Sequence, residues 1–383
     1  MALHFETAEF EARKERVVEE MARRKLDAML LFAPESQYWL TGFDSFGFVF
    51  FQCLVLTRDG HFTLLTRSPD LRQARHTSLI EDIVTWIDRP DADPATQLRD
   101  LLNNLDLLGS RLGVEYDTHG LTAANGRALE EALRTFAKLE EASDLVPPLR
   151  AIKSAAELVY VKRAGELADD ALDAGLAEIR AGADEGHILA AMQGAVFSGG
   201  GDYSGNPFII GSGADALLCR TKTGRRTLDD SDQITLEFAG AYRLYHVAMM
   251  ETVVIGEPSP YQRELRDAAG EALAACREAM MVGNSFGDVF AAYAHVMEAR
   301  GLSRHRLNAC GYSLGARYAP SWMDWPMFYR DNPVPIEPDM VLFAHMIVMD
   351  SDEQTAMCLG RSFRTSEAAA EPLSRHGADL FIR

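Results

Sequence analysis

Glu237 stands between Leu236 and Phe238 in the run 233–238, which has the pattern of a buried strand. An unpaired charge inside a protein is costly, so a carboxylate in such a place favours a functional role. His246 and His345 also fall in or beside predicted strands, and imidazole can accept a proton or deliver one to a leaving nitrogen near neutral pH. Arg220 carries a fork of donors that suits a substrate carboxylate. Glu237 could position a histidine or stabilise a cationic substrate.

Each of these residue types also has a structural interpretation. A histidine on a strand is more often a satisfied core residue than a catalytic one, and this holds for His246 and His345 alike. Arg220 could be a structural salt-bridge partner, and Tyr312 could be a packing residue whose hydroxyl is bound. The residue types alone leave both interpretations open.

Other catalytic signatures are missing from the sequence. It has no Gly-x-Ser-x-Gly elbow for a serine nucleophile. The glycines at 199–201 lack the spacing of a phosphate-binding loop and predict a turn. The five cysteines form no Cys-x-x-Cys pair, which favours reduced thiols in a cytoplasm.

The composition narrows the range of partners. The formal net charge is −19 and the pI is near 5.0, whereas phosphate contacts to nucleic acid need a basic surface. The N-terminal segment is charged and lacks the apolar centre of a signal peptide. The longest apolar stretches, such as 46–56, are too short to span a membrane. We therefore expect a cytoplasmic protein that acts on a small-molecule substrate, with no nucleic acid and no membrane as partner.

The elements that must hold the polar side chains divide into two domains, because 383 residues exceed a typical single core. In the first, residues 1–148, strand-like runs alternate with helical patterns, which predicts a small mixed α/β domain. The predicted strands cover 28–32, 48–56, 62–65, 83–86 and 111–115, and the predicted helices cover about 10–26, 94–105 and 122–136. Pro147 and Pro148 predict a break in the chain.

The second domain, residues 149–383, opens with a helical pattern over 155–181. Ser154 is its predicted N-cap and Glu157 the capping-box partner. Further helices are predicted over 261–282 and 286–299, and strands over 208–210, 233–238, 248–255, 340–349 and 357–364.

Five phrases of this domain stand in a fixed order. They read LRAIKSAAEL at 149–158, FIIGSG at 208–213, DQITLEFAGAY at 232–242, NACGYSLG at 308–315 and PDMVLFAHM at 338–346. In this order and spacing they resemble the creatinase/aminopeptidase P family, whose members include Xaa-Pro dipeptidases. The resemblance implies an α+β fold, with a small α/β creatinase-type N-terminal domain followed by a pita-bread catalytic domain. It also implies a homodimer in which the partner's N-terminal domain covers the active site.

Metal-using members of this family place two Asp, one His and two Glu ligands in these phrases. The resemblance places five residues of this chain at those positions: Glu237, Ala248, Tyr312, His345 and Gly360. Ala248 and Gly360 offer no side-chain donor, so a dinuclear site with bridging carboxylates cannot form. We therefore expect no metal and no other cofactor. A single ion held by Glu237, His246 and His345 stays open as an alternative.

Loss of the ligands on a retained scaffold resembles the metal-free branch of the family, which includes creatinase and ectoine hydrolase. The phrase GYSLG at 311–315 and the exchange of the family glutamate for His345 resemble ectoine hydrolase. Three features depart from that branch. Arg220 stands where that branch has its acid/base histidine, and Met250 stands where creatinase has its substrate-binding glutamate, with Glu251 one place away. The segment APSWMDWP at 319–326 stands where ectoine hydrolase has the phrase PPDWGE.

The resemblance thus gives two sets of candidate site residues. The catalytic candidates are His246, His345, Glu237 and Tyr312, and the substrate-binding candidates are Arg220, Glu251, Asp324, Trp325 and Phe48. Asp324 and Trp325 belong to an aromatic-rich loop that could close over a cationic substrate, with packing against the dimer mate as the alternative. Phe48 lies in the region that reaches the partner's site in related dimers, with a core strand as the alternative.

These observations predict a metal-independent hydrolase of a C–N bond, amide or amidine, in a small zwitterionic compound. The imidazoles would transfer protons while Arg220 and Glu237 hold the two charges of the substrate. Three alternatives stay open: a metallopeptidase of the Xaa-Pro dipeptidase or aminopeptidase P type, a lyase, and a non-catalytic member that binds a small ligand or a partner.

Overall fold

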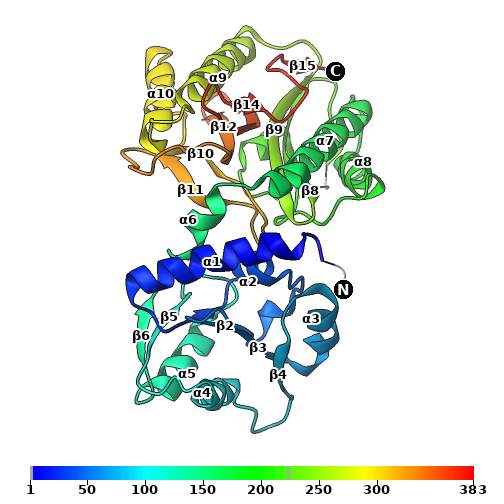
Figure 1. Ribbon diagram of the computed structural model, residues 1–383. Helices are drawn as coiled ribbons and strands as arrows, with labels where there is room; N and C mark the ends of the chain where they lie inside the picture. The colour runs from blue at the N-terminus through cyan, green and yellow to red at the C-terminus, as the bar shows by residue number, and fades with distance from the viewer. Residues whose placement is uncertain (1–2, 222–223, 225) are drawn as a thin grey trace. The chain divides into compact units, whose positions relative to one another are not determined.

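The chain forms two compact units that divide between Arg150 and Ala151 (Figure 1). The structure, a computed structural model, describes residues 3–221, 224 and 226–383. Among these residues, no helix is both long enough and apolar enough to cross a membrane.

The first unit is built on a six-stranded sheet with the strand order β4-β3-β2-β1-β5-β6. Its strands are β1 (Ala28–Leu31), β2 (Cys53–Thr57), β3 (Phe62–Arg67), β4 (Asp82–Trp86), β5 (Arg111–Val114) and β6 (Lys138–Glu141). The central strands β1 and β2 are buried along their whole length, which explains why each reads as a continuous apolar run.

Helices cover both faces of this sheet. They are α1 (Thr7–Arg24), α2 (Pro34–Thr41), α3 (Leu71–Thr77), α4 (Pro94–Asn104) and α5 (Ala123–Leu133). One buried cluster joins the sheet to α1, α2 and α3, and a second joins its opposite face to α4 and α5. The unit is therefore a three-layer α/β sandwich, as the alternating pattern predicts.

Two predictions for this region are wrong in detail. The run 48–56 is not one strand, because Gly47–Val49 forms a short 3-10 helix and β2 begins only at Cys53. The neighbouring strand β1 ends at Leu31, opposite Leu54, so the earlier residues have no such strand to pair with. The chain does divide close to Pro147 and Pro148, between Arg150 and Ala151, but the two prolines do not interrupt the local structure. They occupy the first turn of α6 (Val146–Ala151), where a helix needs no N–H donor from proline.

The second unit is built on a nine-stranded sheet. The main order is β11-β10-β12-β13-β9-β8-β7, with β14 beside β13 and β15 beside β9. The strands are β7 (Ile209–Ser212), β8 (Asp232–Tyr242), β9 (Tyr245–Ile255), β10 (Ala309–Ser313), β11 (Asp324–Tyr329), β12 (Val341–Asp350), β13 (Thr355–Arg364), β14 (Glu371–Pro372) and β15 (Phe381–Ile382).

Four helices pack on one face of this sheet (Figure 1): α7 (Ala155–Glu178), α8 (Glu185–Ser198), α9 (Pro260–Ala279) and α10 (Phe286–Ala299). The predicted capping box of Ser154 and Glu157 begins α7. Close approach of α7 requires Gly240 on β8, where a Cβ would lie 2.1 Å from the carbonyl oxygen of Ala164. The candidate polar residues described below lie on the other face of the sheet.

The aromatic-rich segment that is predicted as a loop is in part an edge strand, β11. Its side chains alternate, with Asp324 and Phe328 buried and Trp325 and Tyr329 exposed. The glycines at 199–201 form the predicted turn after α8, and Gly200 takes a left-handed φ of 83°.

Candidate active site

Glu237 and His345 lie on the same face of the large sheet although three strand-to-strand steps separate them. Glu237 pairs with Met250, Met250 with Gly360, and Gly360 with His345. Directly paired residues of antiparallel strands point to the same side, so this row of four side chains shares one face. Gly240 on β8 has the opposite parity and meets α7, so the row lies on the face away from the helices.

The rings of Tyr312 and Phe343 lie close to that of His345 at its end of the row. Tyr312 on β10 pairs directly with Phe343 on β12, two residues before His345. The ring centroids are 5.5 Å apart for Tyr312 and Phe343, 5.6 Å for Tyr312 and His345, and 5.6 Å for Phe343 and His345. The hydroxyl oxygen of Tyr312 accepts a hydrogen bond of 2.9 Å from the indole Nε1 of Trp322. Neither Phe343 nor Trp322 is among the residues chosen from the sequence. The sequence did contain a signal for each residue. Phe343 stands two positions before His345, which places both on one face of a strand, and Trp322 belongs to the aromatic-rich segment.

Glu237 is a buried carboxyl group without a protein partner. Its side chain is 9% exposed, and it makes no hydrogen bond or ion pair with any residue that the structure describes. Burial raises the pKa of Glu237 to about 7, and the positive charge of Arg220 partly offsets this effect. A carboxyl group with such a pKa can both accept and release a proton at neutral pH.

His345 has an unused nitrogen. The residue is 7% exposed, and its Nδ1 atom has no hydrogen-bond partner among the described residues. Burial lowers the pKa of His345 to about 4, and the charge of Arg220 acts in the same direction. The ring is therefore neutral at physiological pH, and its Nδ1 is buried without a hydrogen-bond partner among the described residues.

Arg220 supplies a positive charge that shifts the pKa values of these groups. Its side chain is exposed, and its charge acts on Glu237, Tyr312 and His345. Burial raises the pKa of Tyr312 above its ordinary value, and the charge of Glu237 adds to the rise. Tyr312 thus stays protonated and can act as a hydrogen-bond donor. The structure brings together four of the predicted site residues: Arg220, Glu237, Tyr312 and His345.

His246 lies on the same face of β9 but has no free nitrogen. It is 0% exposed, its Nε2 accepts a hydrogen bond of 2.8 Å from the backbone N–H of Gly205, and its Nδ1 lies 3.3 Å from the carbonyl oxygen of Gly315. Burial lowers the pKa of His246 to about 4. Both nitrogens of the neutral ring are occupied by backbone groups.

Glu251 does not join the other candidates, because the alternation of the strand turns it to the helix-covered face. There it is 0% exposed and forms ion pairs with Arg266 of α9 and, at 2.7 Å, with Arg361 of β13. The prediction that Glu251 contacts substrate therefore conflicts with its position. Its carboxylate compensates two buried guanidinium groups instead.

Each of the remaining candidates has surroundings of its own. Asp324 is buried and lies 3.6 Å from the guanidinium of Arg317, and Trp325 points to the opposite, exposed side of β11. Phe48 belongs to the first unit, where it is buried in the 3-10 helix Gly47–Val49. These positions do not support a shared cation site built from Asp324 and Trp325.

The residues at the family's metal positions do not fit two metal ions. No cluster of three or more His, Cys, Asp or Glu side chains that could hold a metal occurs among the described residues. At Gly360, a Cβ would lie 2.6 Å from the Cζ atom of Phe343 and 2.8 Å from the Cβ atom of Met250. An aromatic ring therefore occupies the space that a ligating side chain at position 360 would need.

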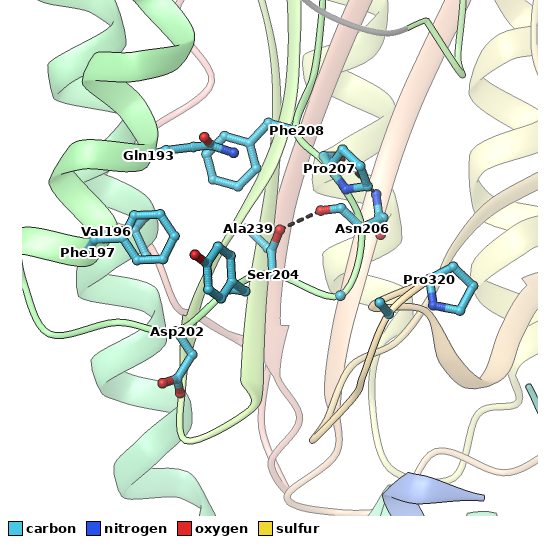
Figure 2. A pocket seen from close by; sticks show the side chains of 13 residues that line it. Gln193, Val196, Phe197, Asp202, Ser204, Asn206, Pro207, Phe208, Ala239 and Pro320 are labelled. Carbon is cyan, nitrogen blue, oxygen red and sulfur yellow. Dashed lines mark hydrogen bonds between the residues drawn. The ribbon is translucent and has the colours of Figure 1, made fainter. Parts of the chain in front are cut away.

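A cavity of about 490 Å³ lies beside this site, between the end of α8 and the segment 202–208. Figure 2 shows Gln193 and Phe197 of α8 on one side and Asn206, Pro207 and Pro320 on the other. The cavity therefore borders the same segment whose Gly205 binds His246.

The fold and the site define a two-domain protein with a creatinase-type N-terminal domain and a pita-bread peptidase domain. A family model described as metallopeptidase family M24 matches residues 160–365, and one described as creatinase/prolidase N-terminal domain matches residues 13–152. The chain belongs to metallopeptidase family M24. The predicted family and fold are confirmed.

Similar proteins cover the whole chain. It is 26% identical over 402 residues to the ectoine hydrolase of Halomonas elongata, covering 100% of this chain and 99% of that protein. It is 20% identical over 330 residues to the Xaa-Pro dipeptidase of Pyrococcus furiosus, covering 86% and 88%. The solved prolidase of Thermococcus sibiricus has the same fold, with a TM-score of 0.88 at 16% identity and coverage of 98% and 99%. The predicted class of enzyme, a hydrolase of C–N bonds, is confirmed at the level of the family.

Proposed function

We propose that this protein hydrolyses a C–N bond, amide or amidine, of a small zwitterionic compound without a bound metal ion. The observation that carries the proposal is the ring of Phe343 over Gly360, which removes one carboxylate position of a dinuclear centre. On the same face, His345 has a buried Nδ1 that no described residue satisfies, and the carboxyl group of Glu237, 9% exposed, makes no hydrogen bond or ion pair with a described residue. Similarity to ectoine hydrolase over the full chain supports the same choice.

Glu237 acts as the proton carrier. Because burial raises its pKa to about 7, it can accept a proton from water as the water oxygen attacks the carbon of the scissile bond. The same proton then passes to the leaving nitrogen as the C–N bond breaks, which returns Glu237 to its carboxylate form. In this form Glu237 also faces the positive charge of an amidine or ammonium nitrogen.

Tyr312 and His345 stabilise the tetrahedral intermediate. The oxygen of Tyr312 accepts the indole N–H of Trp322, so its own O–H is free to donate to the developing oxyanion. His345 offers Nδ1 to the same substrate as a hydrogen-bonding group. With a pKa of about 4 it is a weak base, so Glu237 suits proton transfer better.

Arg220 binds the carboxylate of the substrate. Its guanidinium is exposed, unlike the buried groups of the row, and it bears the charge that a small zwitterion needs opposite its anionic end. Arg220 and Glu237 thus receive the two ends of a molecule that carries both charges.

The test is a screen of cyclic and N-substituted amino-acid derivatives, including ectoine-like and creatine-like compounds, with protein treated with EDTA. We expect turnover that EDTA does not change. Glu237→Gln and His345→Ala should each lower kcat by at least about 100-fold, because each removes a group that acts in the transition state. His295→Ala on the exposed side of α10 is the matched control. Full activity in both site variants would sink the assignment.

A metallopeptidase of the Xaa-Pro dipeptidase type is the second candidate, favoured by the 20% identity to the Pyrococcus furiosus enzyme. It requires a bound transition metal and cleavage of Xaa-Pro dipeptides. Elemental analysis of purified protein and an assay with added manganese decide between the two. Protein without metal that leaves Xaa-Pro dipeptides intact excludes this candidate.

A further inference from the structure

His246 has one hydrogen-bonding arrangement that satisfies both of its nitrogens. Nε2 accepts from the N–H of Gly205 at 2.8 Å and therefore carries no proton. The proton of the neutral ring then sits on Nδ1, which donates to the carbonyl oxygen of Gly315 at 3.3 Å. His246 joins two segments that are 110 residues apart in sequence, from Gly205 to Gly315.

The same two segments meet again at Trp322. The backbone N–H of Trp322 donates to the side-chain oxygen of Asn206 at 3.1 Å, one residue beyond Gly205. A Cβ at Gly205 would lie 2.7 Å from the backbone nitrogen of Trp322, so only glycine permits this approach. The indole ring is 1% exposed, and its Nε1 donates to the hydroxyl oxygen of Tyr312 at 2.9 Å.

The segment 203–207 depends on these contacts for its position. On its other side it borders the cavity of about 490 Å³ (Figure 2), where its contact with α8 is that of the Tyr203 ring with Phe197, at a centroid distance of 4.9 Å. Its bonds to His246 and Trp322 therefore set where Asn206 stands, and Asn206 in turn holds the backbone of Trp322.

We propose that His246 is a positioning residue, which acts through the segment 203–207 and Trp322 to hold Tyr312 with its O–H directed into the site. The role given to Tyr312 rests on the proposed function, whereas the chain of contacts does not. Because Trp322 occupies the oxygen of Tyr312 as donor, the phenolic proton must leave in another direction. Loss of either link lets the hydroxyl rotate or shift without removing any group that touches the substrate.

Kinetics separate positioning from proton transfer. His246→Ala should lower kcat on the order of 10- to 100-fold with little change in KM, which is the effect of a misplaced catalytic group. The pH profile should keep the limb near pH 7 that belongs to Glu237. His246→Gln, which retains an acceptor and a donor, should recover part of the loss. Loss of the pH limb in His246→Ala would overturn the proposal, because His246 would then be the proton carrier.

Trp322→Phe provides the second variant, which keeps an aromatic ring at this buried position and removes the indole N–H together with part of the ring system. It should reproduce the loss of kcat of His246→Ala, and the double variant His246→Ala/Trp322→Phe should lose little more, because the two residues act in series. Trp86→Phe, at a tryptophan of the first unit whose indole N–H donates to the carbonyl oxygen of Phe51 at 2.8 Å, is the matched control and should leave kcat unchanged. Additive losses in the double variant would contradict the proposal.

A spectroscopic arm tests the contacts without any turnover. The emission of Trp322 is isolated as the difference between the native protein and Trp322→Phe. Removing the hydrogen bond in Tyr312→Phe, or its support in His246→Ala, should shift that emission to shorter wavelength. If no substrate is found while the emission shifts, the proposed function fails and the positioning role stands. If the emission stays unchanged in both variants, the positioning role fails whatever the activity.

Discussion

The ring of Phe343 lies against Gly360 so closely that a Cβ on Gly360 would stand 2.6 Å from its Cζ atom. The two residues belong to neighbouring strands, β12 and β13, and the ring fills the space above the glycine. A dinuclear metal centre needs a carboxylate where this ring lies. The contact therefore links the packing of the sheet to the chemistry that the site can perform.

Gly360→Ala should destabilise the protein by about 1–3 kcal/mol, because the added methyl group must displace Phe343 or Met250. Denaturant unfolding measures the change. Gly270→Ala on α9 is the matched control, since a Cβ there meets no atom within 4 Å. This control should be neutral or stabilising by up to about 1 kcal/mol. If both variants change the free energy of unfolding equally, the ring of Phe343 can move aside without destabilising the protein.

Glu251→Gln should destabilise the protein by about 3 kcal/mol or more, because it leaves Arg266 and Arg361 buried without a counter-charge. Glu271→Gln, which breaks an exposed ion pair with Arg300, should cost less than about 1 kcal/mol. Thermal and denaturant unfolding of both variants provide the comparison. A stable Glu251→Gln variant with a raised KM would instead indicate that Glu251 binds substrate.

The free energy of unfolding should depend on pH through Glu237. Its pKa is raised to about 7 in the folded protein, against roughly 4.3 when unfolded. Between these values the folded state holds a proton that the unfolded state has released, so stability falls as pH rises from about 4.3 to about 7 and then levels off. The fall attributable to this group is on the order of 3 kcal/mol.

Glu237→Gln supplies the reference for that measurement, because it cannot titrate. The difference in unfolding free energy between the native protein and Glu237→Gln should change across pH 4.5–7 and stay constant above about 8. A difference that is flat over the whole interval would mean that the carboxyl group has an ordinary pKa.

Arg220→Ala should change two quantities at once. KM for a zwitterionic substrate should rise roughly 10- to 100-fold, since a charge-assisted hydrogen bond is lost. The pKa of Glu237 should rise further, because Arg220 lowers it in the native protein, and the limb of the pH profile should move to higher pH. Arg180→Ala, at an exposed arginine beside Glu178, is the control. A raised KM without a shift of the limb would separate substrate binding from the electrostatics of Glu237.

Local features of the sequence were sufficient for much of the framework. The capping box at Ser154 and Glu157, the bounds of α10 and the turn at 199–201 depend on residues within a few positions of one another. Strand alternation also predicts that Glu251 and Met250 point to opposite faces of the sheet. The structure then shows that Glu251 pairs with Arg266 and Arg361. The failed prediction of a single strand over 48–56 shows the limit, because β1 ends where pairing would have to continue.

The hydrogen-bond partners of each buried polar group could not be derived from local features of the sequence. His246 and His345 have the same residue type and similar apolar neighbours in sequence, yet one is saturated by Gly205 and Gly315 while the other keeps Nδ1 without a described partner. The bonds of His246 span 41 and 69 residues. No local pattern encodes such contacts, because they exist only when distant segments have folded together.

The sequence by itself determined the family, the order of its motifs and the absence of side-chain donors at Ala248 and Gly360, since these are properties of residue type and spacing. Only the tertiary structure decided which polar groups remain available. It buries Glu237 and His345 without described partners, saturates His246, turns Glu251 to the helix-covered face and sets Phe343 over Gly360. The physical reason is that desolvation and hydrogen bonding depend on the three-dimensional surroundings of a group, which sheet pairing and loop contacts assemble from distant parts of the chain.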